Sequence, residues 1–305
     1  MIVIILLLSS IWFSPATSAE FVLLDVRNSA STRGLGVPRG GGLATIVCFG
    51  LEGEPGLLTA PPGGPLPFKL GGIELFVNGA RAPILSVFIP PPEEAAAQRI
   101  EFQVPLERNS TPSELALPVV RQRGVTLNYW LLVPSSQPTF GAFIRDSANY
   151  LTAEHTVDGR RVTPEDPARP GETITVFAID FFNVWPPPPL AVPVPAEPRF
   201  EFSRELIPAD ARVDRGYDRG NLYLQEINRD PSCRFCPTTA PLKILFQGLA
   251  AGKIGIQRID FVVPTDQATG DWPLFFSVGD CPGGEGLCAD PNLRSSEHGL
   301  LPVRQ

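Results

Sequence analysis

The chain has 305 residues, a formal net charge of −7, and a hydrophobic content of 43%. That hydrophobic content is too high for a disordered chain, and the negative charge argues against sequence-independent binding to nucleic acid or to anionic lipid. The 35 prolines and 28 glycines separate short runs rich in Val, Ile, Phe and Thr, which predicts an all-β fold with many turns.

Residues 1–19 form an apolar stretch that ends in small residues, as a secretory signal peptide does. The stretch is too short to cross a bilayer comfortably. We expect cleavage after Ala19 and export to the periplasm, the cell surface or the medium. No lysine or arginine precedes the apolar run, so a buried N-terminal strand or a retained anchor is the alternative.

The remaining chain is long enough for two domains of ordinary size, and the alternation of apolar residues stops at the proline-rich segment 134–138. We therefore expect two tandem β-sandwich units, residues 20–134 and 135–305. Asn78-Gly79 is typical of a two-residue hairpin turn, and Asp158-Gly159 predicts a second hairpin. Strands of the first unit are predicted near 43–51, 73–78, 81–89, 99–104, 117–122 and 125–133.

A near-copy within the chain supports this division. Residues 99–105 (RIEFQVP) return as 258–264 (RIDFVVP), and both alternate in polarity before a proline, as a half-buried strand does. Two weaker echoes accompany them and predict an internal duplication: 42–49 against 171–178, and 73–79 against 242–248. The wider spacing in the second copy places a proline-rich insertion at about 185–240, where a functional loop or a disordered one is expected.

Further strand and turn segments carry a resemblance to a known family. They occur in the family's order across roughly residues 25–280, at 26–31, 44–50, 70–73, 77–83, 100–105, 166–172, 246–252 and 257–264. On these segments the chain resembles an uncharacterised acidobacterial C-terminal domain family of exported proteins, distantly similar to IPT/TIG-type immunoglobulin-like modules. The resemblance implies an exported pair of immunoglobulin-like β-sandwiches. It implies no activity and no functional residues.

The cysteines are interpreted in the light of export. Cys48 lies in an apolar strand and is expected to be a buried free thiol. The other four are disulfide candidates because an exported protein meets an oxidising compartment. A zinc site made of the same four thiols, or a reduced state, is the alternative, although their spacing is unusual for zinc. We expect no metal and no cofactor. The four candidates are Cys233, Cys236, Cys281 and Cys288.

Aromatic residues in and beside the insertion suggest a binding surface. Trp185, Tyr217 and Tyr223 could stack against sugar rings or a peptide. Trp130 lies in an alternating segment and is better interpreted as part of the core.

The sequence offers little for catalysis. Only His155 and His298 could act as a general base without a shifted pKa, and His155 is expected to be an exposed strand residue. Glu154, Asp158 and Asp166 are close in sequence, which alone is poor evidence for a glycosidase. We expect a non-catalytic exported protein for cell-surface or extracellular interaction, of adhesion or scaffold type, with an unknown protein or glycan partner. A carbohydrate-binding accessory protein is the alternative, and an exported hydrolase is less favoured.

Overall fold

The computed structural model describes residues 20–31, 37–38, 40–105, 115–116, 118–127, 133–134, 141–180, 190–194, 220–224, 242–278, 294–295 and 298–305. Every regular element in these ranges is a β-strand, and every ladder between the strands is antiparallel. The all-β prediction is confirmed for this part of the chain. The described residues contain no helix with the length and hydropathy of a transmembrane span.

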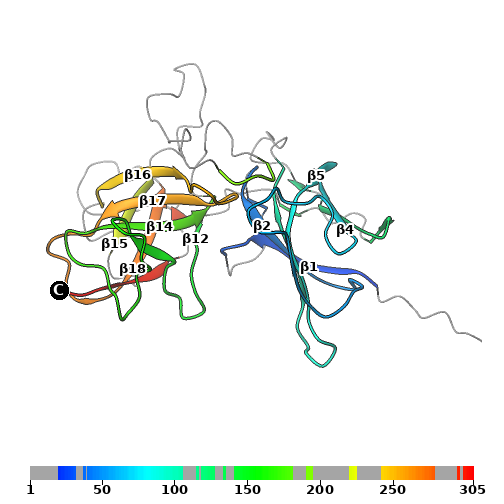
Figure 1. Ribbon diagram of the computed structural model, residues 1–305, viewed down its shortest axis with the longest axis horizontal. Coiled ribbons are helices and arrows are strands. Elements are labelled where there is room, and N and C mark those ends of the chain that lie inside the picture. The colour runs from blue at the N-terminus through cyan, green and yellow to red at the C-terminus, as the bar shows by residue number, and fades with distance from the viewer. Residues whose placement is uncertain are drawn as a thin grey trace, which may run out of the picture.

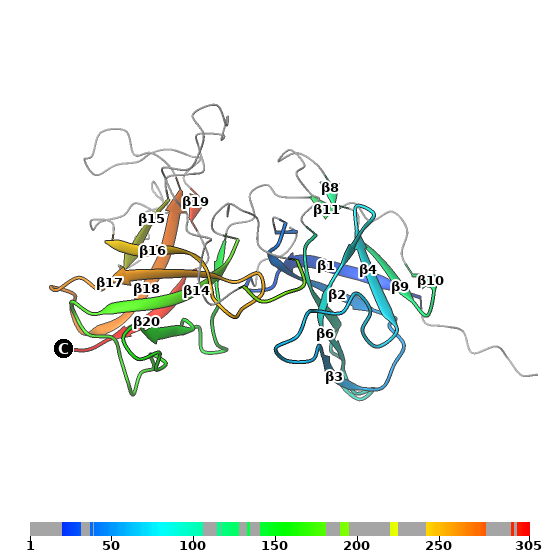
Figure 2. The same cartoon turned by 45° about the horizontal axis from the view of Figure 1, so that its top comes forward.

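The N-terminal part of the chain forms two sheets and a short separate ribbon (Figures 1 and 2). One sheet has the order β1-β2-β7-β6-β3, the other has the order β10-β9-β4-β5, and β11 pairs with β8. The strands are β1 (Val22–Asn28), β2 (Leu43–Phe49), β3 (Gly56–Thr59), β4 (Ile73–Val77), β5 (Ala80–Ala82), β6 (Ile84–Ile89), β7 (Gln98–Gln103), β8 (Leu115–Ala116), β9 (Pro118–Gln122), β10 (Val125–Thr126) and β11 (Val133–Pro134).

The two N-terminal sheets bury their facing sides in one core. Ile46 and Phe102 come from one sheet and Leu75 from the other, and all three are fully buried in the same cluster. Burial alternates along β4, as a strand with one face toward a core requires. The arrangement is consistent with a β-sandwich. Cys48 belongs to this core as a free cysteine, as expected, and burial raises the pKa of its thiol to about 12.

The predicted hairpin turn at Asn78-Gly79 is confirmed and joins β4 to β5. Both residues have positive φ, 52° and 83°, which is the backbone that a type I′ turn demands. Asparagine and glycine tolerate that conformation better than other residues, so the dipeptide itself sets the register of the hairpin.

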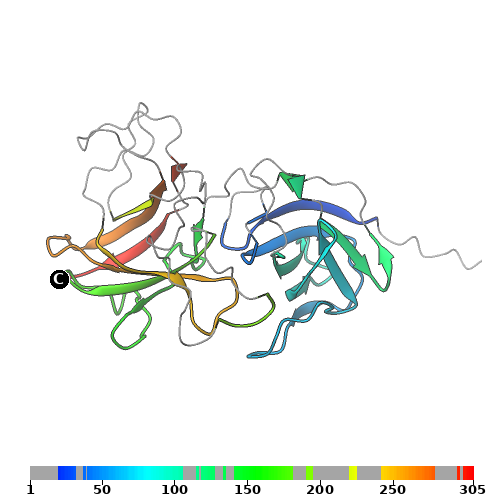
Figure 3. The same ribbon diagram turned by 90° about the horizontal axis from the view of Figure 1, so that it is seen from above.

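The C-terminal part likewise contains two sheets (Figure 3). One has the order β12-β14-β17-β16, with β13 also pairing with β14, and the other joins β15, β19 and β20 to β18. The strands are β12 (Ala142–Phe143), β13 (Ala153–His155), β14 (Thr173–Ile179), β15 (Gly220–Leu224), β16 (Ile244–Leu249), β17 (Gln257–Val262), β18 (Gly270–Val278), β19 (Arg294–Ser295) and β20 (Gly299–Val303).

The C-terminal sheets also share a core. Ile174 and Phe261 from one sheet pack in the same buried cluster as Leu274 from the other. The predicted hairpin through Asp158-Gly159 is present, since the amides of His155 and Val162 donate across it to the carbonyls of Arg160 and Ala153.

The repeated heptads occupy matched places in their sheets. β7 lies between β2 and β6, and β17 lies between β14 and β16. Phe102 is opposite Ala44 on one side and Ile84 on the other, and Phe261 is likewise opposite Ile174 and Ile244. The register then shifts at the same step in both sheets, between Ile84 and Ser86 and between Ile244 and Phe246.

The two weaker echoes need correction. In the matched register Thr45 corresponds to Thr175, so the first echo is displaced by one residue from the sequence alignment. The second echo is wrong, because β4 lies in the other sheet while β16 pairs with β17. The strand that holds the place of β16 is β6. Short alternating strands resemble one another wherever one face is buried, so polarity alone did not identify the sheet.

Buried amide side chains join the two parts of the chain. Asn28 Nδ2 donates to the carbonyl of Ile179 over 3.1 Å. Gln103, which is fully buried, accepts from the amide of Ala191 at 2.7 Å and donates to the carbonyl of Gly41 at 3.0 Å. Because buried polar groups are costly when unpaired, the bonds to Ile179 and Ala191 tie the N-terminal sheet β1-β2-β7 to the C-terminal half.

One glycine allows the closest approach at this junction. Gly255, in the turn between β16 and β17, has a φ of +64°. A Cβ atom at Gly255 would lie 2.6 Å from the carbonyl oxygen of Gly41 and 3.1 Å from Leu43 Cγ. Only glycine therefore fits both the backbone conformation and the space.

Candidate functional site

A cleft lies where the N-terminal sheet meets the C-terminal half. Its volume is about 670 Å³, which is in the range of small-molecule sites. The N-terminal half contributes residues from the end of β1 and from β2, β6 and β7, and the C-terminal half contributes the turn after β12 and the region beside Gly255. The lining residues are Arg27, Ser29, Ala30, Ser31, Leu43, Leu85, Glu101, Ile144, Arg145, Asp146, Ser147, Asn149, Ile179 and Ile256.

Glu101 is the acid that β7 presents to this cleft. The Ser86 hydroxyl donates to Glu101 Oε2 at 3.4 Å, and Ser29 also donates to the carboxylate. Ser29 is in turn hydrogen-bonded to Thr45 at 2.9 Å. Burial raises the pKa of the Glu101 carboxyl, and the two serine hydroxyls and the more distant charge of Arg99 offset that effect only in part.

The other charged residues of the cleft have partners within the protein. Arg27 lies 3.6 Å from the carboxylate of Asp25. Arg145 donates to Asn149 Oδ1 at 2.9 Å and to the carbonyl of His298 at 2.8 Å. Arg27 is thus close to a negative charge, whereas these two acceptors of Arg145 are neutral oxygen atoms.

Asp146 is similarly occupied. Its carboxylate accepts from the amides of Ala148 and Tyr150 and lies 3.2 Å from a guanidinium nitrogen of Arg161. Asp146 thus stabilises its own turn. Among the described residues that line the cleft, Glu101 is the acid with no cation within ion-pair distance.

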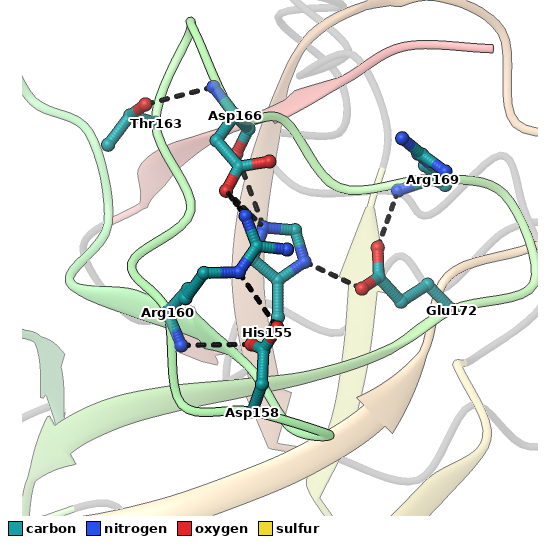
Figure 4. Close-up of polar contacts among 7 residues, drawn as sticks. All are labelled: His155, Asp158, Arg160, Thr163, Asp166, Arg169 and Glu172. Carbon is teal, nitrogen blue, oxygen red and sulfur yellow. Dashed lines mark hydrogen bonds and ion pairs between the residues drawn. The ribbon is translucent and has the colours of Figure 1, made fainter.

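His155 forms a second polar cluster, shown in Figure 4. The expectation of an exposed histidine is wrong, because the residue is only 4% exposed. Its Nδ1 lies 2.6 Å from Glu172 Oε1, and its Nε2 lies 3.3 Å from the carbonyl oxygen of Asp166 and 3.6 Å from Asp166 Oδ2. Both ring nitrogens are thus engaged, and the ring joins the hairpin to the segment that leads into β14.

Two acidic residues near His155 form ion pairs with Arg160. Asp158 accepts from the amide and the guanidinium of Arg160, whose guanidinium also contacts Asp166 (Figure 4). The bonds to Arg160 lower the pKa of the Asp158 carboxyl. The backbones of Glu154 and Arg161 pair in an isolated antiparallel bridge across the hairpin. The contacts of Asp158 and Asp166 with Arg160 stabilise the hairpin turn.

Most residues singled out from the sequence lie outside the described residues. This holds for the signal segment 1–19, for Trp130, Trp185 and Tyr217, and for the side chain of Tyr223, whose backbone belongs to β15. The disulfide candidates Cys233, Cys236, Cys281 and Cys288 lie outside them as well. Those interpretations stay predictions.

Sequence reasoning missed Glu101 as a site residue. The available signal was the one acidic position of the repeated heptad, where the first copy has Glu and the second has Asp260.

Within the described ranges, no group of three or more His, Cys, Asp or Glu side chains is placed to hold a metal ion. No protein-family model matches the chain, and no curated protein matches it.

Proposed function

We propose that the chain is an exported, non-catalytic protein for cell-surface or extracellular interaction, which binds its partner or ligand in the cleft between its two halves. The observation that carries the proposal is the cleft itself, because residues from both halves line it. Concave sites with convergent polar groups, set where two packed bodies meet, are the usual place for a ligand.

The proposal includes an internal duplication, with immunoglobulin-like units at residues 20–134 and 135–305. The matched neighbours of β7 and β17 and their shared register shift support it. On this view the insertion at about 185–240 belongs to the second unit, and its residue Ala191 contributes to the junction that shapes the cleft.

The carbohydrate-binding alternative depends on Trp185, Tyr217 and Tyr223. Sugar sites usually include an aromatic platform, and no aromatic side chain is among the described residues that line the cleft. The alternative is therefore tested apart from the cleft, by asking whether Trp185→Ala abolishes saturable binding on a glycan array.

A plugging variant tests the main proposal. Ser147 is exposed on a turn that lines the cleft, so Ser147→Trp should fill the cleft without disturbing either core. Ala148 is the exposed neighbour that does not line the cleft, and Ala148→Trp is the matched control. The full chain is screened against immobilised peptides, envelope glycans and soluble metabolites.

We expect at least one class of ligand to bind saturably, with binding lost in Ser147→Trp and kept in Ala148→Trp. Binding that is indifferent to Ser147→Trp in every class, or turnover of a bound compound by the purified chain, would contradict the proposal. Export is tested separately by mass spectrometry of the secreted protein, which should begin at Glu20.

A further inference from the structure

The two matched acids have different partners. Asp260 in β17 corresponds in register to Glu101 in β7, since each lies opposite a threonine, Thr175 or Thr45, of the neighbouring strand. Both threonines are hydrogen-bonded to a hydroxyl of the next segment, Thr175 to Thr156 at 3.0 Å and Thr45 to Ser29 at 2.9 Å. A pair of hydrogen-bonded hydroxyl groups thus lies beside each acid. Thr175 donates directly to Asp260, whereas Glu101 accepts from serine hydroxyls.

The pairing of the acid with an arginine occurs in only one of the two sheets. Arg258 donates two parallel hydrogen bonds to the carboxylate of Asp260, from Nε to Oδ1 at 2.8 Å and from Nη2 to Oδ2 at 2.7 Å. This two-pronged pairing is the strongest arrangement between a guanidinium and a carboxylate. The corresponding Arg99 instead lies over the ring of Phe88, 4.8 Å from its centroid, and it is not within ion-pair distance of Glu101.

The position of an aromatic ring accounts for the difference. Phe246 lies under Arg258, 5.4 Å from the guanidinium carbon, at the register position that Ser86 holds in the other sheet. Phe88 is two residues farther along β6, directly opposite Arg99. Glu101 is thereby left with hydroxyl partners only, at the wall of the cleft.

We propose that the cleft recognises a ligand through an ammonium or guanidinium group, which binds Glu101 in the role that Arg258 has for Asp260. This inference rests on the proposed function and names the chemistry of its ligand. The formal charge of −7 favours approach of a cationic partner. The ligand group can belong to a basic side chain of a partner protein or to a free amine.

Three isoleucines of the cleft wall make the test direct. The full chain is labelled at isoleucine methyl groups, and the resonances of Ile144, Ile179 and Ile256 are followed as probes are added. The probes are blocked tripeptides Gly-Lys-Gly and Gly-Arg-Gly, the neutral Gly-Gln-Gly, the acidic Gly-Glu-Gly, and putrescine. Peptide and putrescine arms distinguish a protein side chain from a free amine.

We expect saturable shifts with the lysine or arginine peptide or with putrescine, and none with the glutamine or glutamate peptide. Glu101→Gln keeps the size of the side chain and removes its charge, so affinity should fall about tenfold or more. Glu94→Gln changes an exposed acid of a distant turn and should leave affinity unchanged. Binding should also weaken as acid protonates Glu101.

The inference is overturned if Glu101→Gln binds the cationic probes as tightly as the unchanged protein, or if no cationic probe moves the three isoleucines. In the second case, shifts produced by the acidic or neutral peptide would leave the proposed function standing with a different ligand. Absence of any ligand sensitive to Ser147→Trp would remove the proposed function too.

Discussion

Glu101 and Asp260 occupy the same place in two similar sheets, yet one faces a cleft and the other is closed off by its own arginine. Each follows the same pattern of neighbours along the heptad, and each accepts at least one hydrogen bond from a hydroxyl group. The comparison shows the acid at the same place in each sheet, with the phenylalanine under the arginine in a different place. Phe246 lies opposite Asp260, whereas Phe88 lies opposite Arg99 and no arginine among the described residues pairs with Glu101.

The largest effect is expected at the junction that forms the cleft. Gln103→Val installs an apolar residue like Val262, its register counterpart in the other sheet, and leaves the Ala191 amide and the Gly41 carbonyl without their partner. Unsatisfied buried groups cost about 1–3 kcal/mol each, so we expect a loss of about 3 kcal/mol in the free energy of unfolding. Urea denaturation measures it, and an unchanged midpoint would mean that the halves are not joined through Gln103.

The next largest effect is expected when the ion pair between Arg258 and Asp260 is removed. Asp260→Asn removes the charge that Arg258 holds and weakens the bond from Thr175, so we expect a loss of about 2 kcal/mol in the free energy of unfolding. The same denaturation experiment at high salt should show a smaller loss, because ions screen the pair where Arg258 is partly exposed. A neutral result would contradict the contrast between the two acids.

A smaller effect tests the close approach at Gly255. Gly255→Ala places a Cβ against the Gly41 carbonyl and strains a positive φ, so we expect a loss of about 1–2 kcal/mol. Gly252→Ala is the matched control, because Gly252 has a similar φ of +70° and nothing within 4 Å of the added Cβ. Equal losses in calorimetry for the two variants would show that the backbone conformation matters and the contact between the halves does not.

The smallest effect is expected at Glu101, where a substitution should increase the free energy of unfolding. Burial raises the pKa of the Glu101 carboxyl, so the folded protein holds that proton more tightly than the unfolded chain. The charged carboxylate is therefore unfavourable in the fold at neutral pH, and this penalty disappears as pH falls below the ordinary glutamate value of about 4.3. Glu101→Gln should raise the free energy of unfolding at pH 7 and leave it unchanged near pH 3. A variant less stable than the unchanged protein at pH 7 would oppose this.

Local signals allowed much of the fold to be predicted. The heptads at 99–105 and 258–264, the Asn78-Gly79 turn and the hairpin at Asp158-Gly159 each depend on residues close in sequence, and each has its counterpart in the structure. The similarity between residues 73–79 and 242–248 did not predict the pairing of β16 with β17. Alternating polarity shows that one face of a strand is buried, but it does not show to which sheet the strand belongs.

The site depends on contacts between distant residues. His155 was expected to be exposed because it lies on a predicted hairpin, but the segment containing Asp166 and Glu172 contacts both nitrogens of its ring. Glu101 borders a cleft that also includes residues of the C-terminal half, and the bonds of Asn28 and Gln103 join that half to its sheet. The periodicity of the sequence predicts neither the burial of His155 nor the cleft at Glu101. The change from Glu to Asp between the two heptads was the one sequence signal at the position of Glu101.

The most direct test of the account is an NMR titration of the Glu101 side-chain carboxyl in the full chain, with its resonance assigned by comparison with Glu101→Gln. The account predicts a pKa above the ordinary glutamate value in the free protein, because burial acts on this acid without a paired arginine. A pKa at or below the ordinary value would contradict this account, because hydrogen bonds or a nearby positive charge would then outweigh the burial of Glu101.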